Sequence, residues 1–196
     1  MKIPLRYQMT EYDCGTTSIL NAITYLYERE EIPPILIYNI NKFTMDEFNE
    51  IGEENKGGTS TPAVGLLAHW INSLSKTRKI DINCEVLEGE NVDILNSKVQ
   101  DCINSGGVII ARVWLSDEHY VIITKLEDEY AYIFDPYYVD INKYDDDSEV
   151  EIVKFRKLEY NRKVTLKRIS SHNKEDYSLV DNENKQLLLI NRKKLP

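Results

Sequence analysis

The sequence predicts an α+β fold of two lobes, with helices first and an antiparallel sheet second. Apolar residues recur every three or four positions through much of the first hundred residues, as they do on one face of a helix. From residue 107 onward, β-rich runs follow one another closely, without the alternation with helices that builds a parallel sheet. A length of 196 residues suits one domain. We expect a helical lobe over about 1–106 and a sheet lobe over about 107–196, within which 141–196 form a β-rich extension.

Three helices are predicted in the first lobe. The first covers 14–31, where an apolar stripe is followed by two prolines that stop the helix. The second begins at Thr61, whose hydroxyl can cap it. The third runs from Asn91, as its cap, to the glycine pair at 106–107. The segment 35–58 fits either a short helix or an irregular loop.

Strands are predicted wherever β-branched and aromatic residues gather in short runs. A short acidic turn at Asp128-Glu129 joins the runs 119–126 and 130–135, and this spacing predicts a hairpin. The other predicted strands are 79–89, 108–115, 150–155, 164–169, 177–180 and 186–191.

The composition argues against several classes of function. Lys and Arg number 24 against 33 Asp and Glu, a net charge of −9, so a large basic surface for nucleic acid or an anionic membrane is not expected. This acidic balance makes a basic substrate one option. Three cysteines without a CxxC pair predict neither a disulfide framework nor a zinc site. We therefore expect a reduced, cytoplasmic protein without a metal or other cofactor.

Three residues that can carry chemistry, Cys14, His119 and Asp135, lie far apart in the sequence. Cys14 stands where the first predicted helix begins. His119 starts the first strand of the predicted hairpin, and Asp135 ends the second. Because the start of one hairpin strand lies beside the end of the other, we expect His119 and Asp135 to be close enough for a hydrogen bond.

A cysteine, a histidine and a carboxylate are the components of thiol catalysis. The thiolate is the nucleophile, and both a helix N-terminus and a nearby imidazolium favour it. Asp135 would hold the histidine in the required orientation. An acyl-transfer intermediate needs hydrogen-bond donors for its oxyanion, which the Cys14 backbone N–H and the Gln8 side-chain amide can supply. Gly15 has no side chain, so backbone and substrate can approach closely there.

The stretches "Q…DCGTTSILNAITYL", "GTSTPAVGLLAHW" and "HYVIIT…YIFDPY" resemble papain-like cysteine peptidases. Among these, the bacteriocin-processing type that cleaves double-glycine leaders is the most similar. The resemblance covers roughly residues 3–140 and implies a papain-like fold with an N-terminal helical lobe and a C-terminal sheet lobe. It further implies Cys14 as nucleophile, His119 as general base, Asp135 as orienting acid and Gln8 as oxyanion donor.

The sequence departs from that family at three points. Glu118 precedes the histidine, where the family usually has a small residue, often glycine. Leader-processing members are usually joined to the membrane domain of a transporter, whereas no run here approaches the roughly 20 apolar residues of a membrane helix. Residues 141–196 lie outside the resemblance.

Less specific interpretations apply to the remaining candidates. We expect Cys84 and Cys102 to pack in the core, and Tyr12 and Trp114 to be walls of a substrate cleft. The leading function is a thiol-dependent hydrolase acting on a peptide or amide bond. The alternatives are an acyltransferase that uses the same acyl-enzyme intermediate and a non-catalytic binding protein on the same fold.

Overall fold

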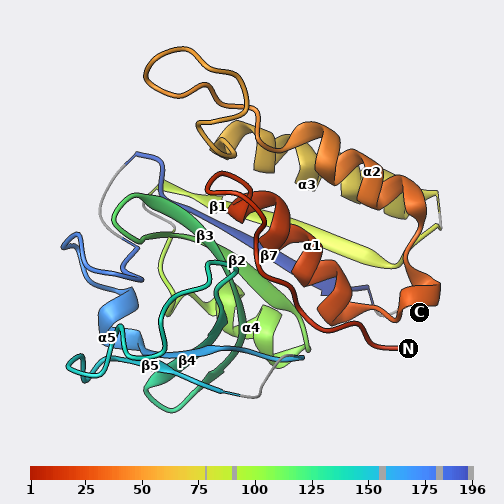
Figure 1. Ribbon diagram of the computed structural model, residues 1–196. Coiled ribbons are helices and arrows are strands. Elements are labelled where there is room, and N and C mark those ends of the chain that lie inside the picture. The colour runs from red at the N-terminus through yellow and green to blue at the C-terminus, as the bar shows by residue number, and fades with distance from the viewer. Residues whose placement is uncertain (78, 90–91, 155–157, 180–182, 194–196) are drawn as a thin grey trace.

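The computed structural model describes residues 1–77, 79–89, 92–154, 158–179 and 183–193. These residues form a seven-stranded antiparallel sheet with helices on both of its faces (Figure 1), which confirms the predicted α+β class. The helices are α1 (Cys14–Leu26), α2 (Pro34–Phe43), α3 (Thr61–Lys76), α4 (Ser97–Asn104) and α5 (Leu166–Ile169), with a 3-10 turn at Arg29–Glu31. The strands are β1 (Ile82–Glu88), β2 (Val108–Trp114), β3 (Glu118–Glu127), β4 (Tyr130–Phe134), β5 (Val150–Ile152), β6 (Arg162–Thr165) and β7 (Gln186–Arg192).

The order of strands across the sheet is β1-β7-β2-β3-β4-β6-β5. The last strand of the chain, β7, thus lies between β1 and β2, where Leu188 is opposite Val86 on one side and Ile110 on the other. The predicted hairpin is present as β3 and β4, with Ile122 opposite Phe134. In the described part of the chain, three strands follow residue 140. β6 and β5 extend the sheet beyond β4, and β7 lies inside the sheet between β1 and β2.

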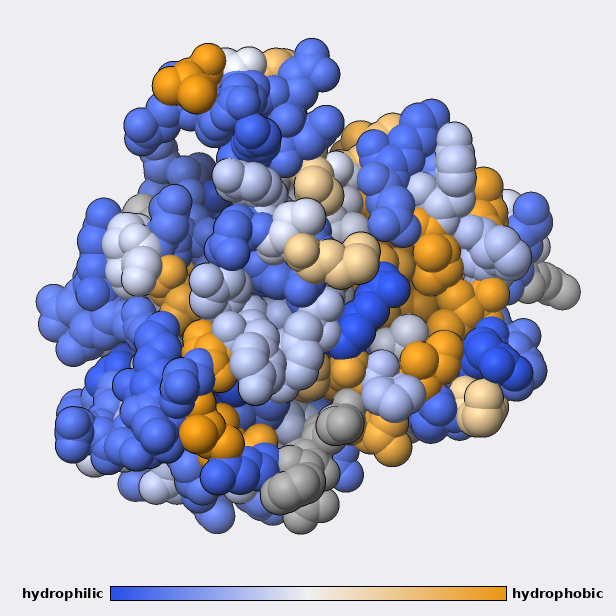
Figure 2. All heavy atoms as spheres, in the orientation of Figure 1, coloured by the Kyte–Doolittle hydropathy of each residue, from blue (hydrophilic) through white to orange (hydrophobic). Residues whose placement is uncertain are grey.

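Alternation of side chains along the strands divides the core in two. One face of the sheet, with Ile110, Ile122 and Leu188, is covered by α1, α2 and α3. The opposite face, with Ile109 and Leu187, packs against α4, α5 and nearby loops. Figure 2 shows hydrophobic residues gathered on the right of the molecule and hydrophilic residues over the loops on the left. The side chains of Cys84 and Cys102 are buried in these cores, as expected.

Several predicted helix boundaries were wrong. The first helix ends at Leu26, because Tyr27 is already extended. The helix at 61–76 is capped by the Ser60 hydroxyl, which accepts from the Ala63 N–H, and not by Thr61. The third helix begins only at Ser97, where the preceding asparagine caps it; the expected cap Asn91 lies outside the described residues.

Two predicted strands also differ. The run 164–169 is a strand only as far as Thr165, whose hydroxyl accepts from the Arg168 N–H and starts the short helix α5. In the predicted strand 177–180, residues 177–179 form no strand, and residue 180 lies outside the described residues. Tyr177 has φ of 71°, which is incompatible with an extended backbone. The segment 35–58, left open by the sequence, contains α2 followed by a long loop.

Candidate active site

Cys14 begins α1 because the preceding loop is tied down by the carboxylate of Asp13. Its two oxygens accept hydrogen bonds from the backbone N–H of Met9 (3.1 Å) and of Thr10 (2.7 Å). The side chain of Asp13 is buried and also contacts the Thr17 hydroxyl. The loop therefore delivers the Cys14 thiol to the first turn of the helix, where backbone N–H groups lack intrahelical partners.

His119 and Asp135 meet at the end of the β3–β4 hairpin that the sequence predicted. His119 Nε2 lies 2.8 Å from Asp135 Oδ1, and both side chains are buried. Since Nε2 faces the carboxylate, Nδ1 is the ring nitrogen left for Cys14, whose thiol lies near enough to His119 for their charges to interact. The ring of His119 thus lies between the Cys14 thiol at the start of α1 and the carboxylate of Asp135, the residue that directly follows β4.

The charges of this trio stabilise one another. Burial alone would raise the pKa of the Cys14 thiol, but the charge of His119 and its hydrogen bond prevail and lower it. Burial would lower the pKa of His119, yet Asp135 and Cys14 together raise it to about 10. Burial would raise the pKa of Asp135, but the charge and hydrogen bond of His119, the Arg162 charge and the Tyr177 hydroxyl together outweigh burial and lower that pKa. The arrangement therefore favours a thiolate beside an imidazolium.

The other two cysteines differ sharply from Cys14. Burial raises the pKa of Cys84 to about 12 and that of Cys102 to about 11. Cys102 Sγ lies 3.6 Å from the Val108 carbonyl oxygen, inside the core. Neither thiol is placed to ionise near neutral pH.

A cleft of about 720 Å³ opens above the trio. The loop between α2 and α3, at the top of Figure 1, forms one of its walls with Phe48 and Gly57, and the turn between β2 and β3 forms another. Other lining residues are Gln8, Glu11, Tyr12, Cys14, Glu118, His119 and Tyr137. Tyr12 is thus at the cleft, where the sequence analysis put it.

Gln8 lies beside Cys14 in this cleft. Its backbone N–H donates to the Pro136 carbonyl at 2.9 Å, and its side-chain Nε2 donates to the Thr10 carbonyl at 2.7 Å. These bonds hold the loop before α1 against the residue that follows Asp135. An amide nitrogen carries two N–H groups, so the bond to Thr10 uses one and leaves the second for another acceptor.

Gly15 and Trp114 have different surroundings from those expected. A Cβ on Gly15 would lie 2.7 Å from the Cβ of Thr59 and 3.2 Å from the Tyr120 ring. The missing side chain thus makes room for the protein's own packing.

Trp114 lies at the end of β2. The ammonium of Lys174 is placed over its ring, 4.1 Å from the centre of the Trp114 ring. Glu118, which departs from the family pattern, forms an ion pair with Arg112 (2.6 Å) at the cleft.

The sequence analysis missed the residues that hold Asp135. Asn161 brackets its backbone, accepting from the Asp135 N–H and donating to its carbonyl, both at 2.8 Å. Arg162 and Tyr177 gather on the outer side of the same carboxylate. All three come from the region after residue 140, and single polar residues in a strand-rich stretch give no signal of such a role.

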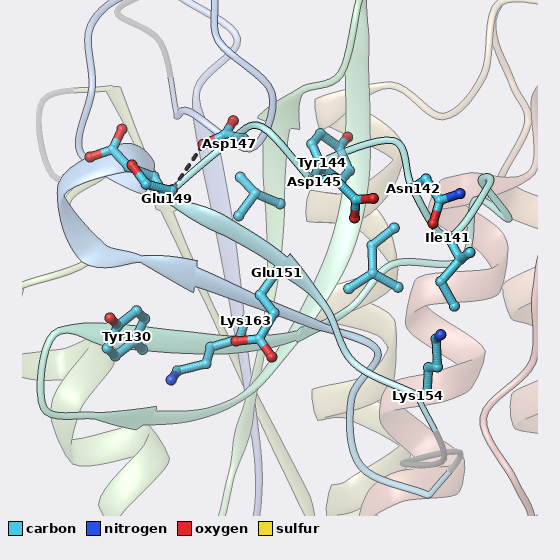
Figure 3. A pocket seen from close by; sticks show the side chains of 13 residues that line it. Tyr130, Ile141, Asn142, Tyr144, Asp145, Asp147, Glu149, Glu151, Lys154 and Lys163 are labelled. Carbon is cyan, nitrogen blue, oxygen red and sulfur yellow. Dashed lines mark hydrogen bonds between the residues drawn. The ribbon is translucent and has the colours of Figure 1, made fainter.

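A second hollow, of about 380 Å³, lies between β5, β6 and the loop after β4 (Figure 3). Its acidic side chains include Asp147 and Glu149, both of which form ion pairs with Arg168. These pairs tie the loop to α5. Among the described residues, no group of three or more His, Cys, Asp or Glu side chains is arranged to hold a metal ion.

The sequence matches no protein-family model and no curated protein. Several solved structures resemble the fold, and two of them are compared with this chain. One is a chain from Bacillus anthracis described as a C39-like peptidase, with 13% identity and a TM-score of 0.54 over 98% of this chain and 96% of that one. The other is a double-glycine motif protease from an AMS/PCAT transporter in complex with the leader peptide, with 14% identity and a TM-score of 0.46 over 98% and 93%.

The first of these similarities establishes the class of the fold. The chain has the papain-like fold of C39-type peptidases, as the resemblance implied. Within the part of the chain that the structure describes, no helix combines the length and apolarity needed to cross a membrane.

Proposed function

We propose that this protein is a thiol-dependent hydrolase that cleaves a peptide or amide bond, with Cys14, His119 and Asp135 as its catalytic triad. One observation carries the proposal: the buried ring of His119 bonds to Asp135 through Nε2 and lies near enough to the Cys14 thiol for their charges to interact, and both Cys14 and His119 line one cleft. Triads of this kind are recognised by geometry and roles.

The first half of the reaction forms an acyl-enzyme. The Cys14 thiolate attacks the carbonyl carbon of the scissile bond, and the resulting oxyanion accepts from the Cys14 backbone N–H and the second amide N–H of Gln8. His119, as the imidazolium, gives its proton to the leaving amine as the C–N bond breaks. The products of this half are a free amine and a thioester on Cys14.

The second half releases the acyl group. His119, now neutral, takes a proton from water, and the water oxygen attacks the thioester carbonyl. The C–S bond breaks, the carboxylic acid leaves and the thiolate–imidazolium pair is restored. If an amine took the place of water, the same intermediate would give acyl transfer.

The three free cysteines favour a reducing compartment such as the cytoplasm.

Cys14→Ala tests this function directly. With the nucleophile removed, cleavage of a mixed peptide library, followed by mass spectrometry, should fall to the background of buffer alone. The fold should persist, because only a sulfur at the edge of the core is lost. The matched control is Cys84→Ala, which removes a thiol from the core and should leave turnover unchanged. Equal cleavage by Cys14→Ala and the wild type would overturn the proposal, and products joined to an added amine would identify a transferase.

A further inference from the structure

The carboxylate of Asp135 is fully occupied on both of its oxygens. Oδ1 accepts from the Tyr137 backbone N–H at 2.8 Å and faces His119. Oδ2 lies 2.7 Å from the hydroxyl of Tyr177, a residue 42 positions further along the chain. Asp135 and Tyr177 are both 0% exposed. Water therefore does not replace Tyr177 at this oxygen, and the second half of the carboxylate depends on that one hydroxyl.

The direction of the hydrogen bonds follows from chemistry. Arg162 Nε lies 3.0 Å from the Tyr177 hydroxyl oxygen, and a guanidinium can only donate. The hydroxyl thus accepts from Arg162, and its single proton points to Asp135 Oδ2. Burial and the Asp135 charge raise the pKa of Tyr177 well above its ordinary value, so the hydroxyl keeps this proton.

All three guanidinium nitrogens of Arg162 donate hydrogen bonds to groups close to Asp135. Its side chain is 2% exposed, and its other two nitrogens donate to the carbonyl oxygens of Asn161 (3.0 Å) and Tyr137 (3.3 Å). These residues contact the backbone and carboxylate of Asp135. A buried guanidinium without a carboxylate in direct contact is costly. Here the Tyr177 hydroxyl lies between the Arg162 guanidinium and the Asp135 carboxylate, and the two opposite charges face each other across it.

The backbone at Tyr177 is strained in a way that fixes this position. Its φ of 71° is a left-handed conformation that a bulky aromatic residue rarely adopts. The conformation is held by the bond from the Tyr177 N–H to the Trp114 carbonyl at 2.7 Å and by that from the Trp114 N–H to the Ser178 carbonyl at 2.8 Å. The end of β2 thus clamps the segment that aims the phenol at Asp135.

We propose that Tyr177 and Arg162 are positioning residues that orient the Asp135 carboxylate toward His119 and keep it ionised. This inference rests on the proposed function. Tyr177 fixes the rotation of the carboxylate, and the Arg162 charge opposes its protonation. Residues 141–196 lie outside the family resemblance. The proposal gives two of them a role in the triad, Arg162 in β6 and Tyr177 in the segment before β7.

The charged and titratable groups around the carboxylate come from several elements. Cys14 from α1 and His119 from β3 lie on one side, while Arg162 from β6 and Tyr177 lie on the other. Tyr144, from the loop after β4, packs against the Tyr177 ring in a tilted arrangement, with 5.8 Å between the ring centres. Its hydroxyl donates to Asp176, which also pairs with Lys143. Tyr144 therefore contacts the same ring but not the carboxylate, which makes it a matched control.

The test compares Tyr177→Phe with Tyr144→Phe. The first variant removes the donor to Asp135, so the carboxylate should protonate at a higher pH and His119 should lose its partner earlier on acidification. The pKa of Asp135, read from the pH dependence of the 13C resonance of its side-chain carboxyl group, should move up by roughly one pH unit. The rate constant kcat should fall with little change in KM. Tyr144→Phe should leave the pKa of Asp135 and both constants at their wild-type values.

A second variant covers the case in which Tyr177→Phe does not fold. The double variant Tyr177→Phe, Arg162→Met removes donor and charge together and leaves no unpaired guanidinium. It should show the same upward shift of the Asp135 pKa. Superimposable profiles of the wild type and of whichever variant folds, or an equal shift in Tyr144→Phe, would overturn the inference. By contrast, a wild-type Cys14 that titrates like an ordinary buried thiol would overturn the proposed function itself.

Discussion

The three cysteines carry the same functional group, and their surroundings alone separate them. Cys14 stands beside a buried imidazolium at a helix start, so its pKa falls although burial acts to raise it. Cys84 and Cys102 have no such partner, and burial raises their pKa to about 12 and about 11. The reactivity expected of Cys14 therefore depends on His119 more than on the exposure of the sulfur.

Removing that imidazole should reverse the shift. In His119→Ala, burial acts on the thiol unopposed, so the pKa of Cys14 should rise above the ordinary value of about 8.5. Alkylation by iodoacetamide should then be slow at neutral pH and accelerate only in alkaline solution. In the wild type, it should stay fast well below pH 8.5 and decline only as the thiolate is protonated.

The control for this variant is His69→Ala, which removes an exposed histidine on α3. Its alkylation profile should coincide with that of the wild type. A His119→Ala profile that also coincided with the wild type would mean that the thiol is not activated by this ring.

At the residue scale, the sequence was sufficient for the parts of the site that depend on local geometry. The short turn of the β3–β4 hairpin is enough to bring His119 to Asp135, and Cys14 is marked by its place at a helix start. The sequence suggests that the space at Gly15 admits substrate, whereas in the structure Thr59 fills this space. The sequence does not reveal that contact. Tyr177 escaped notice because its partner lies 42 residues away.

Among the elements, α1 matters most because its position fixes Cys14, the proposed nucleophile. It packs on β2, β3 and β7, and the Ser18 hydroxyl donates to the Tyr120 carbonyl at 2.8 Å. The loop from α2 to α3 presses on its first turn through Thr59, which leaves no space for a side chain at position 15. A small displacement at this point would move Cys14 away from His119.

Gly15→Ala is therefore expected to destabilise the protein and to slow the chemistry. The added Cβ would lie 2.7 Å from two side-chain atoms of Thr59, and overpacking of this kind costs about 1–3 kcal/mol. Urea unfolding would measure the loss. The matched control is Gly65→Ala in α3, where nothing lies within 4 Å of the new Cβ. That change should raise the free energy of unfolding by about 0.5–1 kcal/mol. A stabilising Gly15→Ala would contradict the packing described here.

Element boundaries were less predictable than the elements themselves. The apolar stripe of the first helix extends past Leu26, yet the chain turns there. Capping explains why the start of the third helix was predicted at the wrong residue. Asn96 is as good a cap as Asn91, and helix propensity does not choose between them. The predicted strand at 164–169 failed for a similar reason, since the hydroxyl of Thr165 starts a helical turn.

For the whole molecule, the dominant feature is the return of the chain end to the centre of the sheet. β7 pairs with β1 and β2, strands whose residues precede it by about 80 or more positions. Pairings at such distance leave no trace in local patterns, so the sequence predicted β7 as a strand but not its place. The same long return carries Tyr177 to Asp135, and so the proposed triad and the residues around it come from α1, β3, the end of β4, β6 and the segment before β7.

The central claim is that Cys14 is a nucleophile activated by His119 at a peptide-binding cleft. The most direct measurement exposes the folded protein at pH 6 to a library of peptidyl chloromethyl ketones and maps the adducts by mass spectrometry. The account predicts a single adduct on Cys14, selective for some peptide sequences, which disappears in His119→Ala. Adducts spread evenly over Cys14, Cys84 and Cys102, or labelling of Cys14 at an unchanged rate without His119, would contradict it.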